Sequence, residues 1–139
     1  MRTAIDTNII SALWTKEANV SAVIRQLQVA REHGGLVICP IVYIELCAYP
    51  RVRVADVKRF LKETKIDFDD EVPRKVWEMA AEAYAHYAGR RRESGDASPK
   101  RMPADFIIAA HASQRADRLL TLDQRRYQAD FPELTLVEC

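Results

Sequence analysis

Four carboxylates lie beside segments that resemble buried strands or the first turns of helices. Asp6 follows the apolar run 3–5, Asp123 follows the run 119–122, and Glu45 and Asp105 come shortly after prolines that can begin helices. Acids gathered in one place repel one another and destabilise a fold unless a divalent cation supplies positive charge. Because oxygen-only ligand sets select hard cations, the pattern predicts a pocket for Mg²⁺ or Mn²⁺.

The segments that carry these acids alternate between strand-like and helix-like patterns. Strands are expected at residues 3–5, 36–39, 66–68, 119–122 and 134–137, and helices at 8–14, 21–33, 40–48, 54–65, 73–91, 103–112 and 124–129. This order predicts an α/β fold, a single domain over residues 1–139 with a central parallel sheet of about five strands flanked by helices. Since parallel strands end at one edge of a sheet, the four acids are expected to meet there.

Composition narrows the class of protein. A length of 139 residues with 48% hydrophobic content suits one core, and a formal charge of +1 argues against a globally basic nucleic-acid binder. Three cysteines without C-x-x-C spacing favour a reduced, cytoplasmic compartment. Asp6 comes too early for a signal-peptide core, and the longest apolar stretch, 36–44, is too short to cross a bilayer. No membrane association is expected.

Each of these acids also fits a simpler role, because aspartate at a strand end or in a first helical turn often serves as a cap or turn former. It is their shared edge and their order that favour a site. A second acidic run, Asp67, Asp69, Asp70 and Glu71, precedes Pro73, where the start of a helix favours negative charge. Capping is the expected role of that run.

At the level of motifs, the chain resembles the PIN-domain nucleases over its whole length. The motifs occur in the family's order: Ala4-Ile5-Asp6-Thr7-Asn8, Glu45 in its own helix, Pro103-x-Asp105-x-x-Ile108-Ala109-Ala110, and Leu120-Thr121-x-Asp123. The size, the Asp6-Thr7-Asn8 start and the ending from Thr121 through Phe131-Pro132 to Leu136 look like VapC toxins of bacterial toxin–antitoxin pairs.

This resemblance implies an endoribonuclease in which Mg²⁺ or Mn²⁺ activates water for in-line attack on a phosphodiester, leaving a 5′-phosphate and a 3′-hydroxyl. It implies that Asp6 and Asp105 are direct ligands, followed by Asp123, and that Glu45 acts through a coordinated water. Asn8 and Thr121 match polar support positions that can orient a carboxylate. Thr7 is expected to touch a substrate phosphate. The implied partners are RNA, a small VapB-type antitoxin that covers the acidic pocket, and a second copy in a homodimer.

A basic rim flanks the stretch 94–99, the only loop-like composition of any length, which is expected to be exposed and mobile. It comprises Arg90, Arg91, Arg92, Lys100 and Arg101 and leads directly to Asp105. These side chains are candidates for gripping RNA phosphates beside the metal pocket. The alternative is that arginines at a helix C-terminus complement its dipole and stay solvated.

Two functions from other classes remain alternatives. The Asp6-Thr7-Asn8 start faintly resembles the D-x-D motif of haloacid-dehalogenase phosphatases, which would make this a phosphoacceptor domain, although the second aspartate is missing. A nuclease-dead RNA-binding module is the other, but four acids along the path of a polyanion would hinder binding without metal.

Overall fold

A computed structural model provides the structure, which describes residues 1–95 and 100–139. Helices and strands alternate along the chain in the order β1 (Thr3–Ile5), α1 (Thr7–Thr15), α2 (Val20–His33), β2 (Leu36–Ile38), α3 (Pro40–Cys47), α4 (Val54–Thr64), β3 (Ile66–Phe68), α5 (Arg74–Ser94), α6 (Pro103–Arg115), β4 (Arg118–Thr121), α7 (Arg125–Gln128) and β5 (Leu136–Glu138). Pro40 and Pro103 begin α3 and α6, where the missing N–H of proline breaks no helical hydrogen bond.

The five strands form one parallel sheet in the order β3-β2-β1-β4-β5. The strand order reverses direction at β1, which pairs with β2 on one side and β4 on the other. In open parallel sheets, sites form outside the carboxyl ends of the strands at such a reversal. The residues that follow β1 and β4 are therefore placed side by side by the topology.

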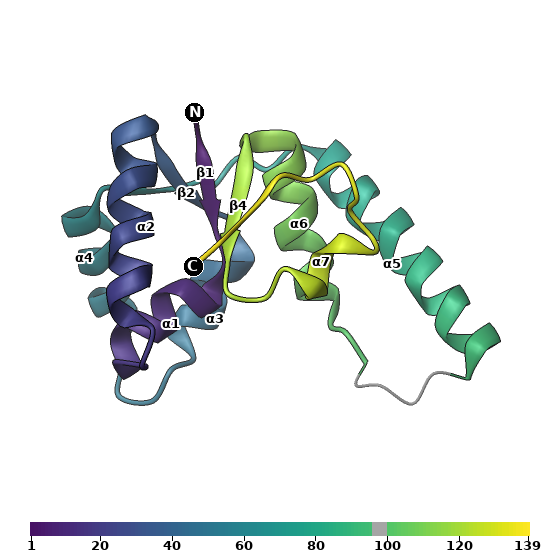
Figure 1. Ribbon diagram of the computed structural model, residues 1–139, viewed down its shortest axis with the longest axis horizontal. Helices are drawn as coiled ribbons and strands as arrows, with labels where there is room; N and C mark the ends of the chain where they lie inside the picture. The colour runs from purple at the N-terminus through teal and green to yellow at the C-terminus, as the bar shows by residue number, and fades with distance from the viewer. Residues whose placement is uncertain (96–99) are drawn as a thin grey trace.

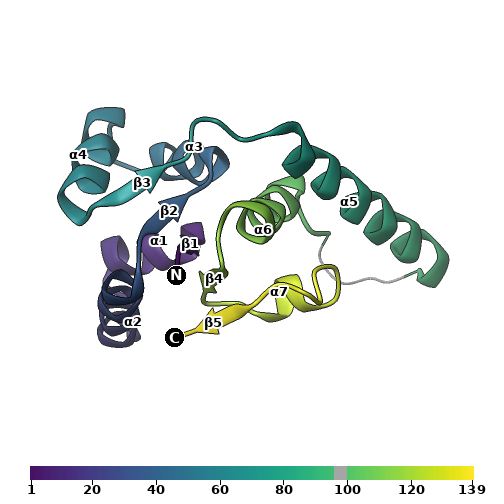
Figure 2. The same ribbon diagram turned by 90° about the horizontal axis from the view of Figure 1, so that it is seen from above.

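Helices cover both faces of the sheet. Figures 1 and 2 show α1, α2 and α4 on one side and α6 on the other, with α5 outside α6. All three residues of β1 and of β2 are buried, whereas only Ile66 is buried in the edge strand β3. Central strands covered on both faces read as continuous apolar runs, which explains why these short segments were recognisable in the sequence.

The predicted α/β class, element order and parallel sheet are confirmed, with differences at the element ends. Leu122 lies outside β4 because its N–H donates to the side chain of Asn8 (3.1 Å). A turn closed by Leu134 N–H and the Phe131 carbonyl (3.1 Å) delays β5 to Leu136. α5 continues past Arg91 to Ser94, where Gly95 at φ 64° ends it. Most of the expected loop, residues 96–99, lies outside the described residues.

The prediction that the acidic run 67–71 caps a helix is wrong for α5. That helix has no acid in its first turn and no side-chain cap at Pro73. Asp69 instead is buried and accepts hydrogen bonds from Arg115 Nε (3.0 Å) and Nη2 (3.2 Å) and from His111 Nε2 (3.0 Å). It joins the end of β3 to the last turns of α6, a contact between segments far apart in the sequence.

Within the described ranges, no helix has both the length and the apolar character needed to span a membrane.

Candidate active site

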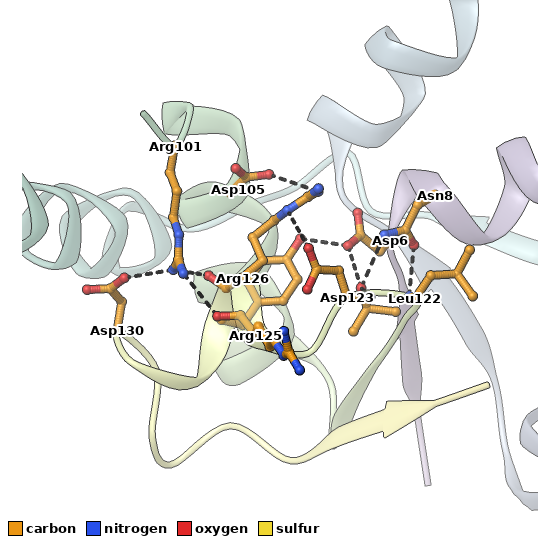
Figure 3. A network of polar contacts seen from close by, with 11 residues as sticks. Asp6, Asn8, Arg101, Asp105, Leu122, Asp123, Arg125, Arg126 and Asp130 are labelled. Atoms are coloured by element: carbon orange, nitrogen blue, oxygen red, sulfur yellow. Dashed lines mark hydrogen bonds and ion pairs between the residues drawn. The ribbon is translucent and has the colours of Figure 1, made fainter. Parts of the chain in front are cut away.

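The sheet and two helix starts bring the four predicted carboxylates to one edge. Asp6 follows β1 and Asp123 lies two residues past β4, and these neighbouring strands pair Ile5 with Leu120. Asp105 lies in the first turn of α6, and Glu45 lies just over one turn into α3. Figure 3 shows Asp6, Asp105 and Asp123 around one space. The charge of Asp6 influences the pKa of both Glu45 and Asp105, so these acids do converge.

Asp6 is the most buried of the four, with 1% of its surface exposed. Its Oδ2 accepts two hydrogen bonds, from the hydroxyls of Thr121 (2.8 Å) and Tyr127 (2.6 Å). Burial, then the charge of Asp6 and the hydrogen bond to it, raises the pKa of the Tyr127 phenol, which keeps it a donor. The two donors hold Asp6 in one orientation, and no residue within 1–95 or 100–139 donates a hydrogen bond to its Oδ1.

Thr121 is the centre of this polar network. Its Oγ1 accepts from the side-chain amide of Asn8 (3.4 Å) and from the backbone N–H of Asp123 (3.1 Å). A hydroxyl has two lone pairs and one proton, so with both lone pairs used the proton is committed to Asp6. Thr121 therefore contacts Asp6 directly, whereas Asn8 contacts Thr121 and the N–H of Leu122. The supporting role of both residues in the site stays a prediction.

Glu45 is held by Thr7, whose hydroxyl donates to Glu45 Oε1 (2.6 Å). Burial raises the pKa of Glu45, and the charges of Asp6 and Asp105 add to that effect, while the hydrogen bond from Thr7 opposes it. The hydroxyl predicted to touch a phosphate is therefore committed to a carboxylate in this structure.

Asp105 and Asp123 share the guanidinium of Arg126. Arg126 Nη1 lies 3.5 Å from Asp105 Oδ1, and Nε lies 3.7 Å from Asp123 Oδ2 (Figure 3). Burial raises the pKa of Asp105, the charge of Arg126 counteracts this, and the charge of Asp6 adds to it. The pKa of Arg126 is itself raised: burial disfavours its charge, but Asp105, Tyr127, Asp6 and Asp123 together outweigh burial. Arg126 thus supplies a positive charge inside the acidic pocket.

Two of the four arginines predicted to bind RNA are engaged within the protein. Arg101 donates to Asp130 (3.1 Å), to the carbonyl of Arg125 (3.0 Å) and to the carbonyl of Arg126. Arg90 also pairs with Asp130, at 2.5 Å. Arg101 therefore connects the segment before α6 to α7 and fixes the backbone that carries Arg126 (Figure 3). Arg91 is half-buried and Arg92 is exposed. RNA binding by these four arginines stays a prediction.

Two residues of the site, Tyr127 and Arg126, were missed from the sequence. Both lie on α7: Arg126 is three positions and Tyr127 four positions after Asp123, a spacing that places helical side chains near a preceding residue. A cavity of about 570 Å³ opens beside them, lined by Lys100, Arg101, Met102, Asp105, Asp123, Arg125 and Arg126. Its wall is basic and two of the acids lie on it, a combination that suits a phosphate next to a bound cation.

The donor chemistry fits a hard divalent cation, since every candidate ligand is a carboxylate oxygen. Across residues 1–95 and 100–139, however, no three His, Cys, Asp or Glu side chains are close enough together to form a ready metal site. The guanidinium of Arg126 lies against both Asp105 and Asp123. In type, the carboxylate donors suit a hard cation, and an internal cation neutralises two of them in part.

Comparisons with known proteins agree with this architecture. Residues 3–132 match the sequence profile of the family described as PIN domain. Similar solved structures include VapBC-1 from nontypeable Haemophilus influenzae, with 20% identity, a TM-score of 0.66 and coverage of 99% of this chain and 98% of that chain. VapBC2 from Rickettsia felis, bound to a promoter DNA fragment, has 16% identity, a TM-score of 0.64 and the same coverage.

FitAcB from Neisseria gonorrhoeae has 20% identity and a TM-score of 0.64, and the match covers 98% of this chain and 96% of that chain. At these identities the structural matches establish the fold. A search of curated protein sequences finds no match.

Proposed function

As the chain belongs to the PIN domain family, we propose that it is a Mg²⁺- or Mn²⁺-dependent endoribonuclease of the VapC toxin type. The observation that carries the proposal is the acidic pocket, in which burial and the charge of Asp6 raise the pKa of both Glu45 and Asp105. Buried acids that raise one another's pKa are typical of functional sites, where a bound cation neutralises their charge.

In this proposal Asp6, Asp105 and Asp123 hold the metal and Glu45 acts through a coordinated water. The bound cation supplies charge neutralisation of the phosphate and a lowered pKa for its water. Thr121 and Tyr127 hold Asp6 so that Oδ1 is free to bind, and Thr7 holds Glu45. No histidine is required as a base. RNA phosphates would lie along the cavity lined by Lys100 and the arginines of α7.

The residue at position 8 argues against the phosphoacceptor alternative. The D-x-D motif needs a second aspartate there, whereas Asn8 stands in its place, and its side chain is bonded to Thr121 and to the N–H of Leu122. The nuclease-dead RNA-binding alternative is separated from the proposal by metal dependence, because RNA binding that is equal with and without metal would favour it.

The partners follow from the same proposal. A VapC-type protein pairs with a small antitoxin that covers the acidic pocket through a basic side chain, forms a homodimer and works in the cytoplasm. The two VapBC structures of similar fold support this assignment. Light scattering of the purified chain should give the mass of two copies. A mass of one copy, both alone and with the candidate antitoxin, would contradict this part.

The deciding experiment is cleavage of a mixed pool of structured RNA in Mg²⁺, Mn²⁺ or EDTA. We expect discrete cuts that require metal and that fall by at least about 100-fold in Asp6→Asn and Asp105→Asn, because each variant removes a ligand charge. Asp70→Asn is the matched control, since Asp70 is an exposed acid outside the pocket. Thermal melting verifies that each variant is folded. Cuts that persist in EDTA, or in both pocket variants, would overturn the proposal.

A further inference from the structure

Arg126 combines a fixed backbone with a loosely held side chain. Its N–H donates to the Asp123 carbonyl (3.3 Å), its own carbonyl accepts from Arg101, and the next residue, Tyr127, is bonded to Asp6. The guanidinium, by contrast, makes no side-chain hydrogen bond to any described residue. Its two ion pairs are 3.5 and 3.7 Å long, and 37% of the side chain is exposed. The side chain can therefore move without disturbing α7.

The guanidinium of Arg126 lies where the acidic pocket needs positive charge. Asp105 and Asp123 are both proposed metal ligands, and Arg126 is the cation that contacts the two of them. A divalent ion bound by these carboxylates would neutralise the charges that attract Arg126 and would itself repel the guanidinium. The two cations are therefore alternatives for the same pair of acids.

We propose that Arg126 is an exchangeable counter-ion: it pairs with Asp105 and Asp123 in the metal-free protein, and metal binding displaces it toward a phosphate oxygen of the substrate. The first step rests on the metal site of the proposed function, and the second step rests in addition on its RNA substrate. Arg126 lines the basic cavity with Lys100 and Arg125, so a released guanidinium already lies beside the expected path of the phosphates. Guanidinium groups bind phosphate oxygens through paired N–H donors. Arg126 would act as a substrate-binding residue.

The first step is tested by Mn²⁺ binding without RNA. The binding is measured by calorimetry or by the loss of the electron paramagnetic resonance signal of free Mn²⁺. We expect Arg126→Gln to bind Mn²⁺ about three- to tenfold more tightly than the wild type, because no internal cation has to leave. Arg126→Lys, which keeps the charge, should stay near the wild type.

The matched control is Arg125→Gln. It removes the same charge from the neighbouring position on α7, and among the described residues Arg125 has no ion pair with Asp105 or Asp123. Its effect on Mn²⁺ affinity measures the general field of one charge and should remain below about twofold. Equal effects of the two glutamine variants, or weaker Mn²⁺ binding by Arg126→Gln, would overturn the counter-ion.

The second step is tested by fluorescence anisotropy with a labelled RNA in Mn²⁺ and in EDTA, read in the first seconds after mixing, with gel electrophoresis to verify that the RNA is still intact. Arg126→Gln should weaken RNA binding about three- to tenfold in Mn²⁺ and have little effect in EDTA, where Arg126 stays with the carboxylates. Arg125→Gln should act similarly in both conditions. If RNA binding in Mn²⁺ does not depend on Arg126, the phosphate step is wrong. A wild type that neither binds nor cuts RNA contradicts the proposed function, while the Mn²⁺ titration still decides the counter-ion.

Discussion

Asp69 and acids of the pocket follow strands of the same sheet, yet their surroundings shift the pKa of the carboxyl groups in opposite directions. At Asp69 the hydrogen bond from Arg115 outweighs burial, and with the help of His111 it holds the pKa of the carboxyl far below its usual range. In the pocket, burial and neighbouring acids raise the pKa of Glu45 and Asp105. Helix α6 takes part in both, since it carries Asp105 in its first turn and His111 and Arg115 near its end.

The comparison separates an acid that stabilises the fold from acids that need a further cation. Asp69 has a bidentate arginine and a histidine donor, so its charge is matched within the chain. In the part of the chain that the structure describes, Asp105 and Asp123 share one guanidinium, that of Arg126, at ion-pair distance. Breaking the pairing of a completely paired buried carboxylate is strongly destabilising, whereas an incompletely paired set is typical of a functional site.

The largest expected effect is on Asp69. Asp69→Asn should lower the free energy of unfolding by about 3 kcal/mol, because the buried pairing of β3 with α6 loses its charge. Urea denaturation measures this, with the exposed acid in Asp70→Asn as the matched control. The affinity for Mn²⁺ should be the same in the folded Asp69→Asn variant as in the wild type. A stability equal to that of the control would remove the distinction between the two groups of acids.

A smaller loss of stability is expected from Tyr127→Phe. The change removes one of two donors to the buried oxygen of Asp6 and should lower the free energy of unfolding by about 1.5–3 kcal/mol, the range for a hydrogen bond to a charged group. Thr121→Val removes the other donor to the same oxygen and is the natural comparison. If neither variant melts at a lower temperature, the network does not hold Asp6 as described.

The pH dependence of stability distinguishes His111. The carboxylate of Asp69 can only accept, so Nε2 of His111 carries the proton, and Nδ1 is buried without a partner among the described residues. Burial lowers the pKa of His111 despite the opposing charge of Asp69. As the pH falls, His111 in the unfolded chain takes up a proton at a higher pH than His111 in the folded protein. The free energy of unfolding should therefore fall as the pH drops below about 6.5, by at most about 1.4 kcal/mol per pH unit.

His111→Gln keeps an N–H donor for Asp69 but does not titrate, so melting curves between pH 7.5 and pH 5.5 should depend less on pH than those of the wild type. His86→Gln is the control, because His86 is exposed. A wild-type pH dependence that persists in His111→Gln would assign the effect to another group.

The smallest expected effect is a gain in stability in the pocket. Glu45→Gln removes a carboxyl group whose pKa is raised by burial and by the charges of Asp6 and Asp105. The amide oxygen of the variant can still accept a hydrogen bond from Thr7. In EDTA the variant should be about 0.5–1 kcal/mol more stable than the wild type, as often seen when functional charges are neutralised. Since protonation of Glu45 has the same effect, this gain should shrink as pH falls.

Addition of Mn²⁺ should make the wild type more stable than Glu45→Gln, because the metal stabilises more the protein that binds it more tightly. Thermal melting in EDTA and in Mn²⁺ measures both states. A loss of stability in EDTA would mean that Glu45 is a structural acid like Asp69.

The fold was largely predictable because its signals are local. Short apolar runs bounded by Gly34-Gly35, Pro40 and Pro103 determine where strands and helices alternate, and alternation determines a parallel sheet. The position of Asp6 and Asp123 at one edge follows from that order, since β1 and β4 are neighbours. Thr121 was identified by its place in a motif, and its hydroxyl donates to Asp6 in the structure, while its role in the site stays a prediction.

The partners of each acid were not predictable in the same way. Asp69 and the pocket acids share the local signature of a carboxylate at the end of a strand or the start of a helix, and a sequence does not state which cation lies opposite. Arg115 reaches Asp69 from 46 positions away, and Tyr127 reaches Asp6 from 121 positions away. Such pairings depend on how helices pack over the sheet.

The sequence by itself determined that four acids follow the strands and helix starts of one parallel sheet, because hydrophobic periodicity and proline positions act within a few residues of chain. Only the tertiary structure decided that Arg126 faces Asp105 and Asp123 while Arg115 and His111 enclose Asp69. Electrostatic environment depends on distance and burial in three dimensions, and these are set when α6 and α7 pack against the sheet.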